Sequence, residues 1–149
     1  MDGKSLQVSG VGSWFEFSRA AERDLLRVLP ESPGIYVVLF PLPQPRALGL
    51  SDIAYIGKAT NQKGLRGRVR QYYHPGPTQS TNIAMNGRIC QPGCQLRLGF
   101  AICSTGPVAR RLESDLLIDF ERLHGERPPF NLRAALDLLS RIADSRGAR

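Results

Sequence analysis

Two short apolar segments, each carrying a glycine and a tyrosine, constrain the fold of this chain most strongly. The first runs from Gly34 to Phe40, and the second runs from Ile53 to Gly57. Both have the length of strands and are rich in β-branched and aromatic residues, so we expect each to form a β-strand. Together they predict a hairpin, with a glycine where the backbone can turn or approach a ligand closely.

A basic segment follows the second apolar segment directly, and its cations include Lys58, Arg66, Arg68 and Arg70. We expect residues 65–73 to form a short helix whose inward face holds Leu65, Val69 and Tyr72 or Tyr73. A sheet that presents Tyr36 and Tyr55 would then lead into a cationic helix, which is the outline of an anion site. Arginine suits such a site because its planar guanidinium stays protonated and donates hydrogen bonds in pairs.

These residues resemble the sequence landmarks of the GIY-YIG nuclease domain. The matching stretches, in the order in which the family has them, are Gly34–Tyr36, Tyr55–Ala59, Leu65–Val69, Leu112–Leu117 and Pro128–Asn131. They fall within residues 32–132, about two thirds of the chain. Any one stretch alone would be weak evidence, but coincidence is a poor explanation for their shared order.

The resemblance implies a metal-dependent endonuclease that hydrolyses phosphodiester bonds in DNA. The implied catalytic residues are Tyr36, Tyr55, Arg68 and Glu113, and Glu113 is also the implied metal ligand. The implied cofactor is Mg²⁺, with Mn²⁺ as a substitute. The supporting residues are Gly57, Lys58, Tyr72 and Asn131, and the nucleic-acid contacts expected from the basic segment are Lys58, Arg66 and Arg70.

Each of these residue types can take part in phosphodiester cleavage. The reaction needs an attacking water, a group that takes its proton, and positive charge for the pentacovalent transition state. Arg68 can supply the charge, and Glu113 offers a hard carboxylate oxygen to Mg²⁺. A tyrosine takes the proton near neutral pH only if Lys58 or the metal lowers a phenol pKa that is ordinarily about 10. Tyr36 and Tyr55 are both candidates for this role.

Each candidate residue also has a purely structural interpretation. Glu113 could be a solvated helix residue that pairs with Arg110 or Arg111, and the tyrosines could be packed between strands. Asn131 could be a turn residue beside prolines. His74 lies out of register with the family pattern and is either a substitute acid/base group or a surface histidine.

The rest of the chain predicts helices and one further strand. The expected helices are residues 18–29, 82–90, 105–124 and 132–145, and the expected third strand is residues 95–102. Residues 41–52 hold three prolines in five residues, so we expect an insertion loop outside the sheet that contacts substrate or decorates the edge. The predicted fold is α+β, with a small, largely antiparallel three-stranded sheet and helices packed against it, as the resemblance also implies.

We expect one domain with three parts. Residues 1–31 are an arm and a helix that packs on the core, residues 32–132 are the GIY-YIG-like nuclease core, and residues 133–149 are a C-terminal helix and basic tail. An aromatic cluster at residues 14–17 is either a cap on the core or a base-stacking platform. The cap is favoured because stacking platforms usually lie in a groove beside basic residues.

A net charge of +7 and a pI near 9.9 favour an acidic partner, of which nucleic acid is the commonest. Most of the positive charge is arginine, and the codon bias of a GC-rich genome would also favour arginine over lysine. Such a bias does not readily explain why arginines cluster after the second expected strand. The expected partner is DNA, whether duplex, single-stranded or branched, and protein partners are unknown. No apolar run approaches a membrane span, and no secretory signal opens the sequence, so we expect a cytoplasmic protein without membrane contact.

Three cysteines, an odd number, cannot form a complete disulfide framework, which agrees with a reducing compartment. A structural zinc site is the alternative. Cys90 and Cys94 lie four residues apart, and only His74 and His124 could complete their ligand set from a distance. Buried or free thiols, including Cys103, are the favoured interpretation.

Two other function classes fit parts of the sequence. A non-catalytic nucleic-acid-binding module would keep the charge and lose the metal ligand, whereas Glu113 is present here. A toxin-like or restriction nuclease would use the same chemistry in a different role. The sequence contains no separate DNA-reading module such as a zinc finger, so any sequence preference must come from loops or from a partner.

Overall fold

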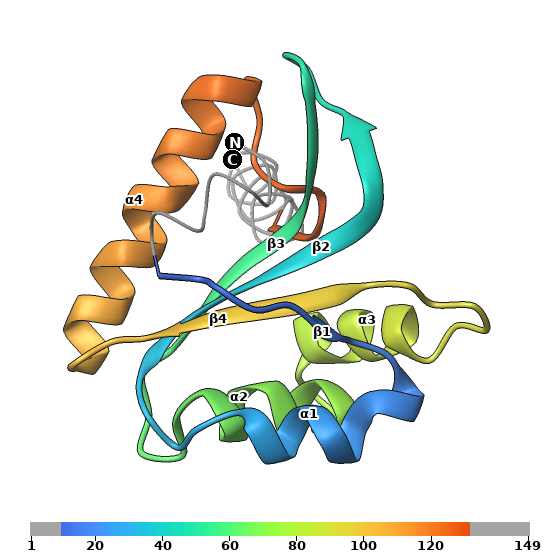
Figure 1. Cartoon of the computed structure of the whole chain (residues 1–149), viewed down its shortest axis with the longest axis vertical. Coiled ribbons are helices and arrows are strands. Elements are labelled where there is room, and N and C mark those ends of the chain that lie inside the picture. The colour runs from blue at the N-terminus through green and yellow to red at the C-terminus, as the bar shows by residue number, and fades with distance from the viewer. Residues whose placement is uncertain (1–9, 132–149) are drawn as a thin grey trace, which may run out of the picture.

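The structure is a computed structural model of the 149-residue chain, and it describes residues 10–131. These residues form an antiparallel sheet with helices on both of its faces (Figure 1). The α+β prediction is therefore confirmed. The helix expected at residues 132–145 and the basic tail lie outside the described residues.

The sheet has four strands, so the prediction of three was wrong by one. The strands are β1 (Phe15–Glu16), β2 (Gly34–Pro45), β3 (Leu50–Ala59) and β4 (Arg97–Ile102), in the order β1-β4-β2-β3. The missed strand β1 pairs only Phe15 with Leu98 and Glu16 with Arg97. A strand of two residues has no periodicity that a sequence could reveal. The neighbouring Phe17 is fully buried, which confirms the cap interpretation for that residue.

The proline-rich segment is part of the hairpin and not a loop outside the sheet, which corrects the expectation for residues 41–52. Strand β2 runs to Pro45, and β3 begins at Leu50. Strand β4 accompanies β2 only as far as Leu39, so beyond it β2 has a neighbour on one side alone. Proline is tolerated on such an edge, because its missing N–H can face away from the partner strand. The register between β2 and β3 shifts between Val38 and Leu39 and again between Leu39 and Gln44.

The tip of the hairpin binds the end of the longest helix, α4 (Gly106–His124). The backbone N–H of Leu48 donates to the carbonyl of His124 over 2.9 Å. Arg46 forms an ion pair with Glu126 at 3.3 Å. The hairpin extension therefore braces α4, which favours the decorating role over contact with substrate.

The helices largely follow the predicted boundaries: α1 (Glu22–Val28), α2 (Gly64–Tyr73), α3 (Ser80–Ile89) and α4, with short 3₁₀ turns at η2 (Arg19–Ala21) and η3 (Pro129–Asn131). Helix α4 begins where the Thr105 hydroxyl accepts from the N–H of Val108 over 3.3 Å, and it ends at Gly125 with φ of 73°. Ser18 makes no capping bond; it donates to Glu16 over 2.9 Å instead. No described helix is both long enough and apolar enough to cross a membrane.

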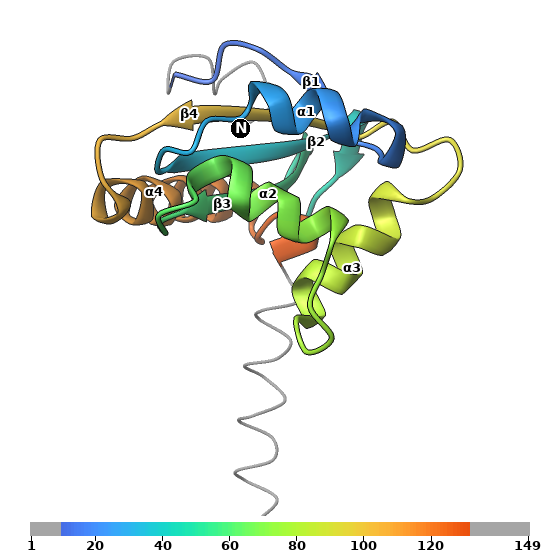
Figure 2. The same cartoon turned by 90° about the horizontal axis from the view of Figure 1, so that it is seen from below.

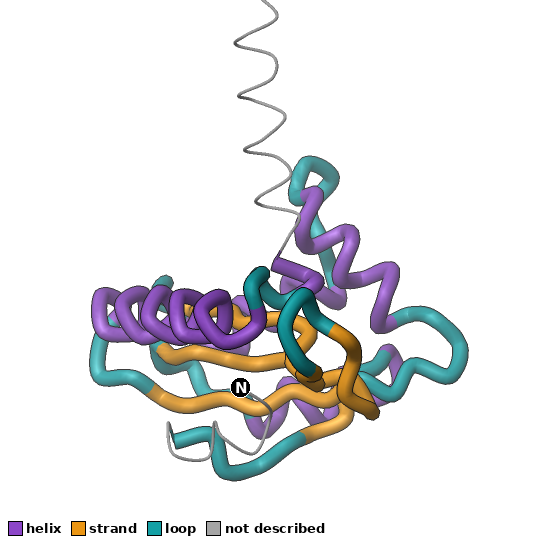
Figure 3. Tube along the Cα trace, turned by 90° about the horizontal axis from the view of Figure 1, so that it is seen from above, coloured by secondary structure: helices purple, strands orange, loops and turns teal. Residues whose placement is uncertain are grey.

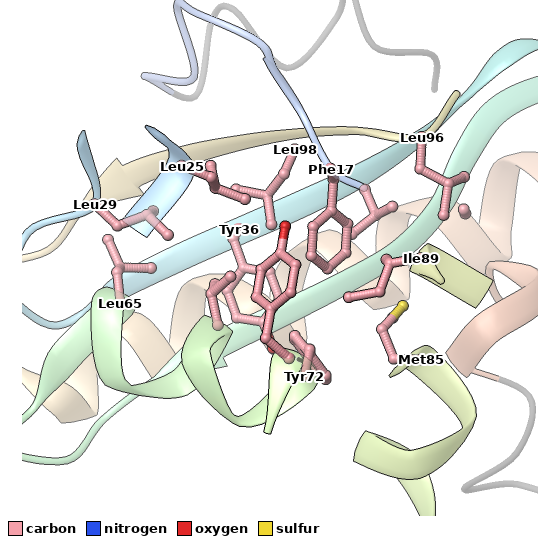
Figure 4. Close-up of a cluster of buried hydrophobic side chains, with 14 of the residues drawn as sticks. Phe17, Leu25, Leu29, Tyr36, Leu65, Tyr72, Met85, Ile89, Leu96 and Leu98 are labelled. Atoms are coloured by element: carbon pink, nitrogen blue, oxygen red, sulfur yellow. Dashed lines mark hydrogen bonds between the residues drawn. The ribbon is translucent and has the colours of Figure 1, made fainter. Parts of the chain in front are cut away.

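The two faces of the sheet carry separate cores. Helices α1, α2 and α3 cover one face, and α4 covers the other (Figures 2 and 3). Because successive strand residues point to opposite faces, Tyr36 belongs to the first core while Ile35 and Val37 belong to the second. Figure 4 shows Tyr36 and Tyr72 among the apolar side chains of the first core. If Tyr36 or Tyr72 takes part in catalysis, it does so from inside the hydrophobic core.

Candidate active site

Three tyrosines from three different elements meet in the first core, between the sheet and α2. Their ring centroids lie 6.0 Å apart for Tyr36 and Tyr55, 6.0 Å for Tyr36 and Tyr72, and 6.5 Å for Tyr55 and Tyr72. The hydroxyls of Tyr36 and Tyr72 share a hydrogen bond. Tyr36 and Tyr72 are fully buried, whereas Tyr55 is half-buried. The structure thus brings together both expected catalytic tyrosines and the expected supporting one.

Gly57 makes this arrangement possible because it lies directly opposite Tyr36 in the β2–β3 register. A Cβ atom at residue 57 would lie 2.4 Å from Cζ of Tyr36 and 2.6 Å from Cε1 of Tyr55. Real Cβ atoms essentially never approach so closely, so any side chain here would push the two rings apart. The supporting role expected for Gly57 therefore has a steric basis.

Replacing Gly57 with alanine should lower the free energy of unfolding by about 1–3 kcal/mol, the usual cost of overpacking a core. Gly87, on α3, is the matched control, because a Cβ atom there would meet nothing within 4 Å. Gly87→Ala should raise stability by about 0.4–1 kcal/mol through the unfolded state. Urea unfolding of both variants checks the pair. Equal stability changes would show that residue 57 is not sterically confined.

Arg68 presents its guanidinium to the tyrosine cluster from α2. Its Nη1 donates to Oδ1 of Asn82 over 2.8 Å and to Oε1 of Gln71 over 3.1 Å. Its Cζ lies 4.5 Å from the centroid of the Tyr72 ring, which is a cation–π distance. Burial by itself would lower the pKa of Arg68, but interaction with the tyrosine oxygens outweighs it, and the net shift is upward. The cluster therefore contains a fixed positive charge.

The two buried phenols are protonated at neutral pH. Burial raises the pKa of Tyr36, and the neighbouring Tyr55 raises it further, while Arg68 opposes the shift. Burial raises the pKa of Tyr72 in the same way. Neither hydroxyl is therefore suited to take a proton from water, although each can donate a hydrogen bond. Tyr55 is the tyrosine of the cluster with its side chain partly open to solvent.

Glu113 lies on α4, and its partner is Lys58 on β3. The Lys58 Nζ is 2.9 Å from Oε1 of Glu113, and the two side chains are 35% and 14% exposed. Lys58 stands opposite Ile35 in the sheet register, so this pair lies on the α4 face. The alternative of a solvated glutamate paired with Arg110 or Arg111 does not describe this side chain. Glu113 is instead held against the sheet.

Asn131 bonds to the outer edge of β3, which is one of the two edge strands of the sheet. Its Oδ1 accepts from the N–H of Ile56, and its Nδ2 donates to the carbonyl of the same residue, both over 3.0 Å. The amide side chain thus pairs with β3 as a neighbouring strand would. The expectation that Asn131 ties its segment to the core is confirmed.

The expected site residues consequently fall into two groups on opposite faces of the sheet. Tyr55 and Lys58, three positions apart on β3, point to the tyrosine face and to the α4 face respectively. The edge strand lies between Arg68 on one side and Glu113 on the other. The candidate active site is therefore a region that straddles the β3 edge.

The basic residues of α2 differ in what they contact. The Nε of Arg66 donates to the carbonyl of Leu29 over 2.8 Å, and its Nη1 lies 3.6 Å from a carboxylate oxygen of Glu31. Arg66 therefore anchors α2 to the end of α1. Arg70 is exposed and lines an open groove of about 640 Å³, whose other lining residues are Glu31, Lys63, Arg66, Gly67, Gln71 and His74. Lys63 adds a cation to this groove that sequence analysis did not single out.

The histidines and cysteines have other surroundings. His74 is mostly exposed and pairs with Glu22, which agrees with a surface histidine. His124 is buried against Phe120 and contacts the carbonyl of Leu48. The three cysteines are free thiols. Within residues 10–131, no three His, Cys, Asp or Glu side chains are grouped so that they could hold a metal ion.

Sequence analysis missed Asn82, which supplies the shortest hydrogen bond to Arg68. A signal for it was present in the spacing. Residues 82, 85 and 89 recur at helical intervals, and the other two are the buried Met85 and Ile89. An asparagine at such a core-facing position must find a polar partner.

No protein-family model and no curated protein matches the sequence. Three solved structures are similar to this chain, all of the GIY-YIG N-terminal endonuclease domain of UvrC from Thermotoga maritima. They are tyrosine-to-phenylalanine point mutants bound to the catalytic divalent cation. Each is 21% identical over 73% of this chain and 92% or 93% of its own, with a TM-score of 0.42. A likeness at this level assigns no role to any residue of this chain.

Proposed function

We propose that this chain is a divalent-metal-dependent endonuclease of the GIY-YIG type that hydrolyses phosphodiester bonds in DNA. The observation that carries the proposal is the Arg68 guanidinium, which lies over the Tyr72 ring of the tyrosine cluster on one side of an edge strand, while Glu113 of α4 pairs with Lys58 on the other side. A permanent cation beside phenol hydroxyls suits a reaction that builds negative charge on phosphoryl oxygens.

The residues present fit a Mg²⁺ site, with Mn²⁺ as a substitute. Glu113 offers carboxylate oxygens from a mostly buried side chain. Magnesium is commonly held by one or two carboxylates, with waters and substrate phosphates completing its shell, whereas structural zinc takes four protein ligands. The bound cation would act as a Lewis acid toward the scissile phosphate. Lys58 orients the Glu113 carboxylate through its hydrogen bond.

The chain's own residues divide the remaining tasks. Arg68 stabilises the charge of the transition state, and the hydrogen bond between Tyr36 and Tyr72 fixes their two hydroxyls relative to each other. Tyr55 is the candidate for handling the proton, because its side chain is half-buried whereas those of Tyr36 and Tyr72 are fully buried. Asn131 and Gly57 hold β3, and therefore Tyr55 and Lys58, in place.

The basic groove along α2 supplies DNA contacts. Arg70 and Lys63 line it, and Arg66 contributes the outer part of its side chain while anchoring the helix. Phosphate contacts of this kind position a nucleic acid without reading its sequence. Gln71 lines this groove and also accepts a hydrogen bond from Arg68, so the groove borders the tyrosine cluster.

The test is a panel of labelled DNA substrates, comprising duplex, single-stranded and branched forms, each incubated with Mg²⁺, Mn²⁺ or EDTA. We expect cleavage of at least one form with either metal and none with EDTA. Binding without cleavage under every condition would identify a non-catalytic nucleic-acid-binding module instead. Cleavage that persists in EDTA would contradict the metal requirement.

A further inference from the structure

Asn82 is a buried polar residue on α3, and its side chain is directed at the candidate site. It is 6% exposed, at a core-facing position in helical register with Met85 and Ile89. Burying an amide without hydrogen bonds costs a few kcal/mol, so this side chain needs partners for both its oxygen and its nitrogen. It finds them in Arg68 and Gln79.

The hydrogen-bond chain around Asn82 fixes which way its amide points. The backbone N–H of Gly76 can only donate, so Oε1 of Gln79, 2.9 Å away, must be the acceptor. The same oxygen accepts from Nδ2 of Asn82 over 2.9 Å, which leaves Oδ1 of Asn82 facing Arg68. The network therefore offers Arg68 a carbonyl oxygen whose orientation is set by the backbone at Gly76.

Docking of α3 onto α2 does not require this contact. Asn86, one turn further along α3, donates through Nδ2 to the carbonyls of Tyr72 and Tyr73 over 2.9 and 3.3 Å. Met85 and Ile89 bury their side chains in the same core. These contacts hold α3 in place, and the hydrogen bond between Asn82 and Arg68 is made in addition to them.

We infer that Asn82 is a positioning residue, which holds the Arg68 guanidinium in the orientation needed for cleavage. The inference rests on the proposed function and extends its site to a third helix. Arg68 is then fixed on three sides, by Asn82 from α3, by Gln71 from its own helix and by the ring of Tyr72. A guanidinium held this way approaches a phosphate without first reorganising.

A double-mutant cycle tests this inference. Asn82→Ala should slow single-turnover cleavage about ten- to a hundredfold, the usual range for a misplaced catalytic group, with little change in DNA affinity. In the Arg68→Ala background the same substitution should cost no further rate, because its target is gone. Asn86→Ala is the control on the same helix, and it should lower stability while the cleavage rate stays near that of the wild type.

A second measurement does not depend on cleavage. The side-chain N–H signal of Arg68 in a nitrogen-edited NMR spectrum can be identified by its absence in Arg68→Lys. We expect this signal to shift or broaden in Asn82→Ala and to stay in place in Asn86→Ala. An unchanged signal in Asn82→Ala would overturn the inference. So would equal rate losses from Asn82→Ala in the wild-type and Arg68→Ala backgrounds. If the wild type cuts no DNA, the proposed function fails, and the NMR comparison alone decides whether Asn82 holds Arg68.

Discussion

Glu113→Gln should lose cleavage by about a thousandfold or more, the largest effect that we expect from any single substitution. Glutamine keeps the shape of the side chain and an oxygen for Lys58, so the helix and its contact with β3 should survive. What it removes is the anionic ligand of a cation that contributes several kcal/mol to transition-state stabilisation, where each ~1.4 kcal/mol corresponds to a tenfold change in rate. Single-turnover cleavage at saturating Mg²⁺ measures the loss.

Glu126→Gln is the matched control for this prediction. Glu126 also pairs with a basic side chain across two elements, at 3.3 Å from Arg46, but it lies at the hairpin tip and away from the proposed site. Its cleavage rate should therefore match the wild type. Mn²⁺ binding measured without DNA gives an independent readout, because only Glu113→Gln should weaken it. Full cleavage activity in Glu113→Gln would remove Glu113 from the site.

Arg68→Ala should lower the single-turnover rate by about a hundredfold to a thousandfold, the typical cost of removing one pre-organised donor to developing charge. DNA affinity should change little, because this interaction strengthens only in the transition state. The loss should exceed that from Asn82→Ala, which leaves the charge in place and only frees its orientation. Quench-flow rates at saturating protein, set beside equilibrium binding curves, measure the two effects separately.

Arg70 is the comparison for Arg68, since it lies on the same helix but is exposed in the basic groove. Arg70→Ala should weaken binding modestly and leave the rate at saturation close to that of the wild type. Arg66 is less suitable, because its bond to the Leu29 carbonyl makes it part of the fold. Stability must be measured first, as the Arg68 side chain packs on the Tyr72 ring. Equal losses of rate and affinity for Arg68→Ala and Arg70→Ala would mean that the cluster is only an electrostatic surface.

The sequence predicted most of the tyrosine face because local patterns determine it. The glycine and tyrosine of each apolar segment place Tyr36, Tyr55 and Gly57 in two adjacent strands, and helical spacing puts Tyr72 one turn beyond Arg68. The start and end of α4 were equally visible, because Thr105 and Gly125 are strong capping residues. Local chemistry was sufficient for these elements.

Contacts between distant segments could not be predicted in the same way. The bond from Lys58 to Glu113 spans 55 positions, and the bond from Arg68 to Asn82 depends on how α3 packs on α2. Strand β1 is a strand only through its pairing with the edge of β4. Tertiary packing decides all of these features, and no local pattern encodes them.

The pairing of Asn131 with Ile56 has a consequence for how the molecule behaves in a crowded solution. An open edge strand invites a second chain to add a strand of its own, which is a common first step in aggregation. Here both backbone groups of Ile56 that face outward are already bonded to one side-chain amide. A foreign strand could not run past this position without expelling Asn131. The Asn131 side chain therefore blocks strand addition at the same edge where the proposed chemistry takes place.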